Sequence, residues 1–305
     1  MISVLVITYN GERFLKEQLD SIYNQTVLPD EVMVSDDCSQ DGTIDILREY
    51  HQRYGLKYFI NPHNLGYLGN LKRSLELCQG DYIVFADQDD TWFPNRIETA
   101  LSKMKQIERN NNPAIVSCNF IHTDAKGKIL QKNYKNIDST DYCLHLFGSV
   151  TMASSSMINR SLLELYRSLP EPKDFMMGII ASMTGNIFRV GDPLFYYRRH
   201  ENNTMNTITL STKKENRVLN KQIKMFFDKY STFYSRPLSS MNEINDVLSK
   251  YFIPERIPLF NKITMCLEQK TVKNKIWHLF NIKEINLIDK LIICCILIKH
   301  RKIEF

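Results

Sequence analysis

The sequence predicts an α/β fold in which a mostly parallel β-sheet carries helices on both of its faces. Strand-like and helix-like segments alternate through the first 110 residues, an order that is typical of parallel sheets with crossover helices. Residues 2–7 form a run rich in β-branched side chains, as expected of a strand that is buried on both faces. Polar or acidic residues follow each of the first four predicted strands.

The elements of the first half follow from this alternation. Strands are predicted at residues 2–7, 31–35, 58–60 and 82–86. Apolar residues at helical spacing follow each of the first three strands, and the third helix should end near Gly80. Pro94 opens a fourth, polar helix, because proline is favoured in the first helical turn. The spaced apolar residues are Leu15, Leu19, Ile22, Ile44, Leu47, Tyr50, Leu68, Leu71, Leu75 and Cys78.

The second half mixes strands and helices before it becomes wholly helical. A fifth strand is predicted at 114–117, a hairpin turn at Lys126-Gly127, a helix at 161–168 and a last strand at 194–197. After about residue 207 the pattern favours helices only, interrupted by Pro237, Pro254 and Pro258. We therefore expect a sheet-containing unit at residues 1–205, divided into halves at about residue 110, and a helical region at 206–305.

Composition and charge exclude several classes of protein. Hydrophobic residues make up 43% and charged residues 24% of the 305 residues, values typical of globular proteins rather than disordered or fibrous ones. The net charge of +5 lies entirely in the segment 262–305, which has nine Lys or Arg against four Asp or Glu. A nucleic-acid-binding protein usually has a basic stripe in its folded part, so we expect no nucleic-acid partner.

Cysteine usage and hydropathy indicate a cytoplasmic protein. The seven cysteines are odd in number and form no C-x-x-C pair, which disfavours a disulfide framework and suits a reducing compartment. The first residues do not have the pattern of a signal peptide. The longest apolar run near the tail, residues 291–298, is too short to span a bilayer.

The tail has an apolar face with basic residues around it. This pattern fits a helix lying on an anionic membrane surface, which would make the protein peripheral to the membrane. It fits equally well a helix that packs on the rest of the chain and exposes a solvated basic face. The apolar residues are Ile282, Ile285, Leu287, Ile288, Leu291, Ile292 and Ile296, and the basic ones are Lys283, Lys290, Lys299, Arg301 and Lys302.

Candidate site residues follow the predicted strands. Parallel sheets bind ligands beyond the carboxyl ends of their strands, so side chains from four strand ends should meet at one edge. These residues are Thr8, Tyr9 and Asn10, then Asp36 and Asp37, then Asn64 and Gly66, then Asp87, Asp89 and Asp90.

Two of these groups suggest a specific chemistry. Asp87 and Asp89 are two residues apart and would face the same side of an extended chain, which suits Mg²⁺ or Mn²⁺; the alternative is an acidic loop or helix cap. The Tyr9 ring can stack on a nucleobase and Asp37 can accept from a pyrimidine imide. The alternatives are loop packing for Tyr9 and a helix cap for Asp36 or Asp37.

Two further segments carry candidate residues in less specific contexts. His200 follows the last predicted strand and could join the carboxylates on a metal, with Arg198 and Arg199 neutralising diphosphate; the alternative is a basic strand end with a surface histidine. Asp174 lies in a polar loop, and its spacing alone gives it no special role. The chain has no G-x-G-x-x-G, Walker A or G-x-S-x-G motif, so a cation is the best candidate to hold phosphate.

Three ordered motifs resemble the family 2 glycosyltransferases of GT-A fold. They are Ile2–Asn10 (ISVLVITYN), Val34–Thr43 (VSDDCSQDGT) and Ala86–Trp92 (ADQDDTW), and the resemblance covers residues 1–205. It implies a catalytic domain whose residues 1–110 bind nucleotide and whose residues 111–205 face the acceptor. The DQDD-x-W form and the segment DPLFYYRRH at 192–200 look most like bacterial rhamnosyltransferases of O-antigen and capsule assembly.

The resemblance implies roles for individual residues. Tyr9 and Asp37 would hold a pyrimidine base in a pocket shaped by Thr8 and Asn10, and Gly66 would lie beside the donor. Asp87 would lie by the ribose, Asp89 and His200 would bind Mn²⁺ or Mg²⁺, and Asp174 would act as general base. The sequence departs from the family pattern at Lys173, where relatives often have an acidic residue or histidine, and at Cys38, where they have glycine.

The implied activity is a metal-dependent, inverting sugar transfer from a nucleotide-sugar to a glycan or lipid-linked acceptor. The donor that the motifs favour is dTDP-rhamnose. A UDP-hexose donor is the alternative within the family, and a non-catalytic nucleotide- or glycan-binding module is the alternative outside it. Sugar-nucleotide synthesis is disfavoured, because the chain has no glycine-rich basic loop after its first strand.

Overall fold

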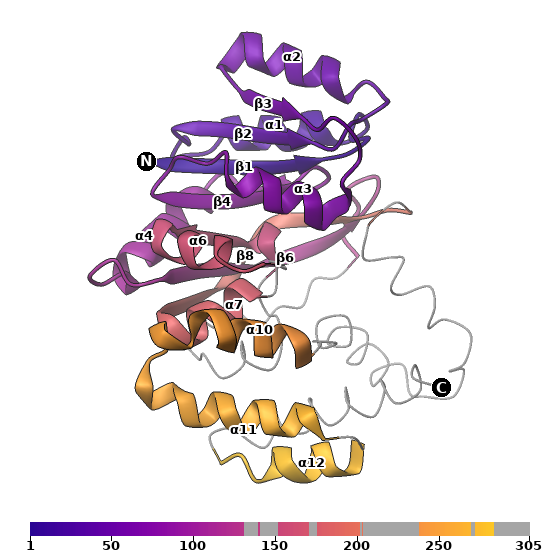
Figure 1. Cartoon of the computed structure of the whole chain (residues 1–305). Coiled ribbons are helices and arrows are strands. Elements are labelled where there is room, and N and C mark those ends of the chain that lie inside the picture. The colour runs from indigo at the N-terminus through magenta and orange to yellow at the C-terminus, as the bar shows by residue number, and fades with distance from the viewer. Residues whose placement is uncertain are drawn as a thin grey trace.

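The fold is an eight-stranded mixed sheet with helices on both faces and further helices at its C-terminal end (Figure 1). The computed structural model describes residues 1–130, 140, 152–170, 176–201, 203, 238–269 and 272–283. The strand order is β3-β2-β1-β4-β7-β6-β8-β5. The predicted α/β fold with a mostly parallel sheet is confirmed, and antiparallel strands enter only in its second half.

The first half contains every element that the sequence predicts there. Strands β2 and β4 pair in parallel with β1, and β3 pairs in parallel with β2. The register places Ile7 opposite both Ser35 and Asp87, so the carboxyl ends of these strands meet at one edge. The elements are β1 (Ile2–Thr8), α1 (Leu15–Tyr23), β2 (Glu31–Asp36), α2 (Thr43–Tyr54), β3 (Lys57–Ile60), α3 (Gly66–Leu75) and β4 (Tyr82–Asp87).

The second half contains more structure than the sequence predicts. Strands β6 and β8 pair in parallel and are far longer than expected, and the predicted turn at Lys126-Gly127 is present, with Gly127 at a φ of 81°. The short strands β5 and β7 and the helix α7 were not predicted. The elements are β5 (Thr91–Trp92), α4 (Arg96–Ile107), β6 (Ala114–Asp124), η1 (Ala153–Ser155), β7 (Ser156–Asn159), α6 (Arg160–Arg167), α7 (Met176–Thr184) and β8 (Asn186–Arg199).

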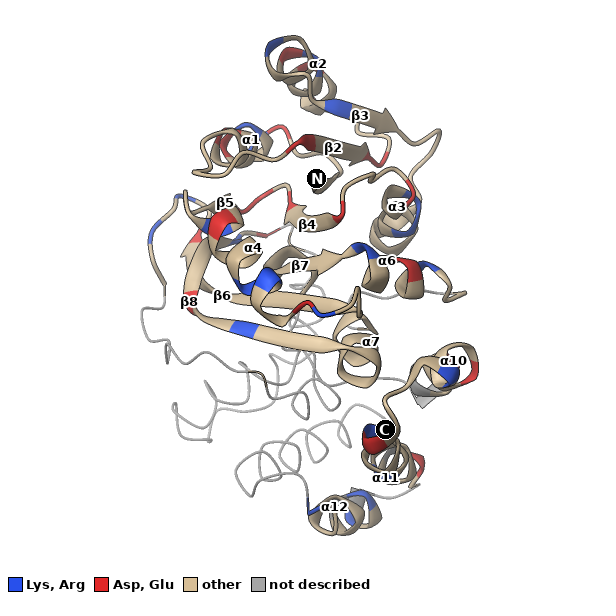
Figure 2. Ribbon diagram, turned by 90° about the vertical axis from the view of Figure 1, so that its left-hand side faces the viewer, with Lys and Arg blue, Asp and Glu red and all other residues tan. Residues whose placement is uncertain are grey.

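Two apolar cores lie on opposite faces of the sheet. Helices α1, α2 and α4 bury residues such as Leu19, Leu47 and Ile97 in one core. Helices α3, α6 and α7 bury residues such as Leu71 and Leu163 in the other. Viewed along the strands, α1 and α4 lie on one side of the sheet and α3, α6 and α7 on the other (Figure 2).

The C-terminal helices extend the second core. They are α10 (Leu238–Leu248), α11 (Ile257–Glu268) and α12 (Val272–Phe280), with short 3₁₀ turns at Ser249–Tyr251 and Pro254–Arg256. Arg256 Nη1 donates to the main-chain oxygens of Ser182 at 2.5 Å and Gly185 at 2.8 Å, at the end of α7. The structure describes only helices in residues 238–269 and 272–283, as the sequence predicts. Of the predicted tail helix, only Ile282 and Lys283 lie among the described residues; they follow the end of α12 outside any helix, and Ile282 is buried in the second core.

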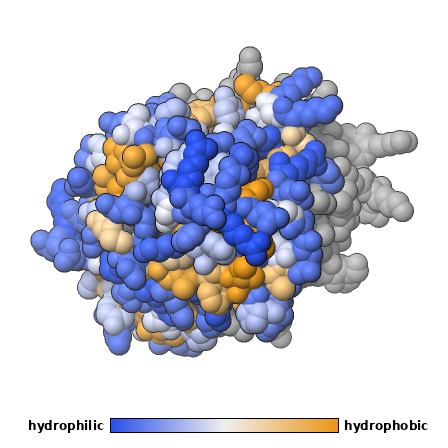
Figure 3. Space-filling view, turned by 90° about the horizontal axis from the view of Figure 1, so that it is seen from above, coloured by the Kyte–Doolittle hydropathy of each residue, from blue (hydrophilic) through white to orange (hydrophobic). Residues whose placement is uncertain are grey.

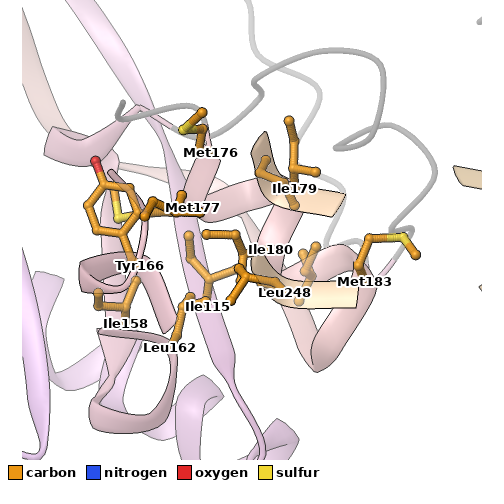
Figure 4. Close-up of a cluster of buried hydrophobic side chains, with 14 of the residues drawn as sticks. Ile115, Ile158, Leu162, Tyr166, Met176, Met177, Ile179, Ile180, Met183 and Leu248 are labelled. Atoms are coloured by element: carbon orange, nitrogen blue, oxygen red, sulfur yellow. The ribbon is translucent and has the colours of Figure 1, made fainter. Parts of the chain in front are cut away.

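Helix α7 is the centre of this core. All nine of its residues are buried. Met177 lies near Tyr166 of α6, and Ile180 lies near Ile115 of β6 and Leu248 of α10 (Figure 4). A helix with no polar face must be enclosed by other elements, and here the sheet and α10 enclose it.

Both edges of the sheet end in short strands. The edge strand β3 has four residues and begins with the exposed Lys57, a charge that discourages pairing with a second sheet. The opposite edge strand, β5, has two residues. Seen from the β3 end, the surface is mainly hydrophilic with scattered apolar groups (Figure 3). Among the described residues, no helix has the length and apolar character needed to cross a bilayer.

Candidate active site at the carboxyl edge of the sheet

The loops after β1 and β2 are joined by main-chain and side-chain hydrogen bonds. The Asp37 N–H donates to the Thr8 carbonyl oxygen at 2.9 Å, and the Asn10 N–H donates to Ser39 Oγ at 2.8 Å. Asn10 and Cys38 have φ values of 48° and 65°, in the left-handed region that favours glycine. Cys38 therefore adopts the backbone conformation expected of the glycine that usually stands at its position.

Asp37 is buried and held by a polar network beneath the edge. Its Oδ1 accepts from Asn61 Nδ2 at 2.9 Å and from the Leu65 N–H at 2.8 Å. Asn61 Nδ2 also donates to Asn70 Oδ1 at 3.0 Å, and that oxygen accepts from Ser35 Oγ at 2.6 Å. Among the described residues both bonds to Asp37 reach Oδ1, so Oδ2 is the atom that can accept from a ligand.

The helix-cap alternative for Asp36 and Asp37 is wrong. Asp41 Oδ1 accepts from the Thr43 N–H at 3.1 Å, in the first turn of α2. Asp36 instead accepts from the N–H and hydroxyl of Ser39. Burial raises the pKa of Asp36, although the bonds from Ser39 oppose that effect. Asp36 therefore holds the loop after β2 through its two hydrogen bonds from Ser39.

Tyr9 presents its ring to solvent at the edge. The residue is 45% exposed, which disfavours the alternative that its ring packs within the loop. Its main chain is anchored to the loop after β4, because the Tyr9 N–H donates to Gln88 Oε1 at 2.9 Å. An exposed ring on an anchored main chain can serve as a stacking surface for a planar ligand.

Asp89 and His200 are in direct contact. Asp89 Oδ2 lies 2.8 Å from His200 Nε2 and accepts from Asn203 Nδ2 at 2.9 Å. Asn203 Oδ1 accepts from the His200 N–H at 2.6 Å, and the Phe14 ring lies 4.7 Å from the imidazole. The His200 side chain is only 6% exposed, so the alternative of a surface histidine is wrong.

The two arginines before His200 are engaged elsewhere. Arg198 is buried, and its Nε donates to the Asp89 carbonyl oxygen at 3.0 Å. Its Nη2 donates to Thr91 Oγ1 at 3.1 Å and forms an ion pair with Glu17 at 2.6 Å. Arg199 Nε bonds to His122 Nδ1 at 3.2 Å. Arg198 therefore holds the Asp89 loop, and its role in neutralising diphosphate stays a prediction.

Asp87 and Asp90 flank the Asp89 pair. Asp87 ends β4, whereas Asp90 is buried, and neither of its carboxylate oxygens has a hydrogen-bond partner among the described residues. Burial raises the pKa of Asp90 well above its ordinary value, and the charges of Asp89 and Asp87 raise it further. The charge of the neighbouring Arg96 opposes the shift.

Only part of a metal site is present in the described chain. Residues 1–130, 152–170, 176–201 and the described C-terminal helices contain no group of three or more His, Cys, Asp or Glu side chains arranged to hold a metal. Asp89 and His200 supply one carboxylate and one imidazole in contact. This donor set fits Mn²⁺ or Mg²⁺ when phosphate oxygens and water complete the coordination.

Of the two remaining predicted site residues, Gly66 lies among the described residues and Asp174 does not. Gly66 begins α3 with a φ of 72° and open space beside its Cα, and its N–H donates to Asn64 Oδ1 at 2.9 Å. Gln88 and Asn203 also contribute contacts at this edge, although neither is a predicted site residue. Gln88 stood between the acidic residues as a possible signal, but no spacing rule pointed to Asn203.

Comparisons with known proteins give one consistent result. The model of the family described as Glycosyl transferase family 2 matches residues 3–166. The dTDP-rhamnosyl transferase RfbG of Shigella flexneri is 26% identical over 264 residues, which cover 81% of this chain and 89% of that protein. The crystal structure of S. aureus TarS 1–349 with UDP-GlcNAc superposes with a TM-score of 0.57 and 18% identity, covering 99% of this chain and 91% of that one. The mannosyltransferase PcManGT of Pyrobaculum calidifontis, in complex with GDP-Man and Mn²⁺, superposes with a TM-score of 0.52 and 15% identity, covering 98% of this chain and 86% of that one.

Proposed function

We propose a specific reaction for this chain from the premise that it belongs to glycosyl transferase family 2 and is a glycosyltransferase of GT-A fold. It transfers a sugar, with inversion, from a nucleotide-sugar to a glycan or lipid-linked acceptor in bacterial surface polysaccharide synthesis. The proposed donor is dTDP-L-rhamnose. The rhamnosyltransferase-like motifs and the similarity to RfbG, over 89% of that protein, support this donor.

The base of the donor is proposed to bind at the loops after β1 and β2. Tyr9 offers an exposed ring for stacking, and Asp37 keeps one carboxylate oxygen for a ligand after Oδ1 has accepted from Asn61 and Leu65. The imide N–H of a pyrimidine base can donate a hydrogen bond to this oxygen. Asp87 would then lie beside the ribose, and Gly66 would leave room for the donor.

The diphosphate of the donor is proposed to lie at Asp89 and His200. These two residues would hold Mn²⁺ or Mg²⁺, and the ion would offset the charge that develops on the leaving diphosphate. Asn203 and the Arg198 guanidinium orient the pair, because they bind the Asp89 carboxylate and the Asp89 main chain. The protein thereby presents a fixed carboxylate and imidazole to the phosphate end of the donor.

Asp174 is proposed as the general base. The carboxylate would take the proton of the acceptor hydroxyl as that oxygen attacks the anomeric carbon from the face opposite the diphosphate. General-base assistance of this kind is worth roughly 10²–10⁴-fold in rate. We expect Asp174→Ala to abolish transfer while the melting temperature and nucleotide affinity stay unchanged, and full turnover by this variant would exclude the role.

The basic tail is proposed to bring the enzyme to the cytoplasmic face of an anionic membrane, near a lipid-linked acceptor. The apolar and basic pattern of residues 282–302 supports this proposal. In liposome flotation, reversal of three tail charges (Lys290, Lys299 and Lys302 to Glu) should release the full chain from anionic vesicles. Reversal of the exposed Lys105, Lys126 and Lys128 should not. Equal flotation of both variants would overturn the membrane role.

One observation carries the proposed function. A continuous series of contacts runs along the edge, from Asp37 through Thr8 to Gln88 and, next along the loop, to Asp89 and His200. A thermal-shift screen of dTDP-rhamnose against UDP-hexoses, with and without manganese, tests it. We expect stabilisation by dTDP-rhamnose with manganese. Stabilisation by a UDP-hexose alone would replace the donor, and donor binding without transfer to any acceptor would favour a non-catalytic module.

A further inference from the structure

The side chain of Gln88 links the loop after β1 to the loop after β4. Gln88 Oε1 accepts from Thr8 Oγ1 at 2.5 Å and from the Tyr9 N–H at 2.9 Å. Gln88 Nε2 donates to the Tyr9 carbonyl oxygen at 3.0 Å. One amide therefore satisfies both main-chain groups of Tyr9, as a neighbouring strand would.

This link matters because little else holds Tyr9. The residue is 45% exposed, so packing of its ring contributes little to its position. The residues on either side of Tyr9 are held separately. Thr8 lies in strand β1, and the Asn10 N–H donates to Ser39 Oγ. The position of the Tyr9 ring is thus set through its main chain, and Gln88 contacts that main chain on both sides.

Gly11 provides the space that the Gln88 amide occupies. A Cβ atom at Gly11 would lie 2.4 Å from Gln88 Oε1 and 2.7 Å from Thr8 Oγ1. The φ of Gly11 is not in the left-handed region, so the position needs glycine for room and not for conformation. The nearer conflict is with the far end of the flexible Gln88 side chain, which can move, and the second is with the hydroxyl of the buried Thr8.

We propose that Gln88 is a positioning residue that holds the Tyr9 ring at a fixed place relative to Asp87 and Asp89. This inference rests on the proposed function, in which Tyr9 stacks on the donor base and Asp89 lies at the diphosphate. Gln88 precedes Asp89 directly and follows Asp87, so its bonds to Tyr9 fix the distance between the two ends of the donor site. Loss of the amide would weaken base binding and leave diphosphate binding intact.

The test uses Gln88→Ala in the full chain, with Gln40→Ala as the matched control. Gln40 is an exposed glutamine nearby whose amide bonds to the Cys38 carbonyl oxygen of its own turn, at 3.0 Å. The readouts are inhibition constants for a pyrimidine nucleoside diphosphate and for inorganic diphosphate, together with KM and kcat for the donor. Because Gln88→Ala loses two hydrogen bonds to the Tyr9 main chain, the inhibition constant of the nucleoside diphosphate and the donor KM should each rise about tenfold. The inhibition constant of inorganic diphosphate and kcat should change less than about twofold, because no bond at the diphosphate end is removed.

A second variant tests the same link from the other side. Gly11→Ala should displace the Gln88 amide and raise the nucleotide constant by a similar factor. In the double variant with Gln88→Ala the combined effect should fall short of the product of the two, because the Gln88 contact is lost only once and only the conflict with Thr8 Oγ1 remains. Multiplicative effects would overturn the link between Gly11 and Gln88.

The outcomes separate the inference from the proposed function. If wild type binds the nucleotide and Gln88→Ala binds it equally well, the positioning role is wrong and the proposed function stands. A parallel loss of nucleotide and diphosphate binding in Gln88→Ala would also overturn the role, because it would show a general loss of the site. If wild type itself binds no nucleotide, the proposed function is refuted together with the inference.

Discussion

Replacing Arg198 by methionine should both destabilise the protein and disturb the site. Arg198 donates to the Asp89 carbonyl oxygen at 3.0 Å and to Thr91 Oγ1 at 3.1 Å, and its side chain is 6% exposed. Methionine keeps most of the aliphatic volume but makes neither bond. The variant therefore removes the polar contacts while disturbing packing as little as the substitution allows.

The expected loss in the free energy of unfolding is the sum of the contributions of the three contacts that Arg198 makes with Asp89, Thr91 and Glu17. The bond from a charged donor to the Asp89 carbonyl is worth about 1.5–3 kcal/mol, and the bond to the Thr91 hydroxyl about 1 kcal/mol. The ion pair with Glu17 adds at most about 1 kcal/mol, because the Glu17 side chain is 55% exposed. Arg198→Met should thus lower the free energy of unfolding by about 2.5–5 kcal/mol, a large part of the roughly 5–15 kcal/mol of a typical protein.

Urea unfolding followed by circular dichroism measures this loss as a shift of the midpoint at constant slope. Glu17→Gln is the control, because it removes only the exposed ion pair and should cost less than about 1 kcal/mol. Below the unfolding transition, Arg198→Met should also lose most of its transferase activity, since the Asp89 main chain is released. If Arg198→Met is no less stable than Glu17→Gln, Arg198 does not hold the loop as argued.

Three further substitutions test other parts of the molecule. Asp37→Asn keeps the Oδ1 acceptor for its two internal bonds, so the melting temperature should hold while nucleotide affinity falls about tenfold or more, as titration calorimetry would show. Ile180→Ala should cost about 2–5 kcal/mol in urea unfolding and leave the donor KM unchanged, because Ile180 lies in the α7 core (Figure 4); a changed KM would contradict this. Burial alone would raise the pKa of Glu31. Hydrogen bonds from Ser3 and the Gln79 N–H, together with the bond and charge of Lys57, outweigh this effect and lower the pKa from 4.5. Wild type should therefore exceed Glu31→Gln in stability above about pH 4.5, and the difference should vanish as the pH falls through the lowered pKa. A difference that grows on acidification, in urea midpoints at pH 7, 4 and 3, would refute this assignment.

The sequence predicted the first half of the fold well because its elements are regular. Strand β1 is a nearly unbroken buried run, and α1 buries Leu15, Leu19 and Ile22 at helical spacing. Such periodic segments carry their structure in local pattern. The parallel order then places Thr8, Asp37 and Asp87 at one edge by topology alone.

The second half was less predictable, for identifiable reasons. All nine residues of α7 are buried, so the helix has no polar face and no amphipathic period to detect. Strand β8 contains Gly191-Asp192-Pro193, which reads as a turn. In the structure the strand continues through these residues, and its register with β6 shifts between Cys118 and Asn119. Asn119 Nδ2 donates to the Gly191 carbonyl oxygen at 2.5 Å.

Site residues could be predicted where they follow strands and not where they act through long-range contacts. Asp89 and His200 were predicted to share a metal because each follows a strand, and the structure brings them into contact across 111 positions. Asn203 and Gln88 act on neighbouring loops through their amides, and an amide in a loop has no signature in sequence. Their roles depend on which segments lie side by side, and this depends on the whole sheet.

The acidic loop is held at both ends by the sheet, and this explains how distant packing reaches the site. At its start, Asp87 is paired in register with Ile7 of β1. At its end, Thr91 of β5 is paired with Tyr196 of β8, shortly before Arg198 and His200. Strand β8 in turn pairs with β6 along most of its length, and Leu194 and Phe195 near its end pack in the core that α1, α2 and α4 share. This packing fixes the end of β8, and the end of β8 holds Asp89 through Arg198 and His200. A loop held in this way can keep its carboxylate in place before any ligand binds, which is the condition for a preorganised site.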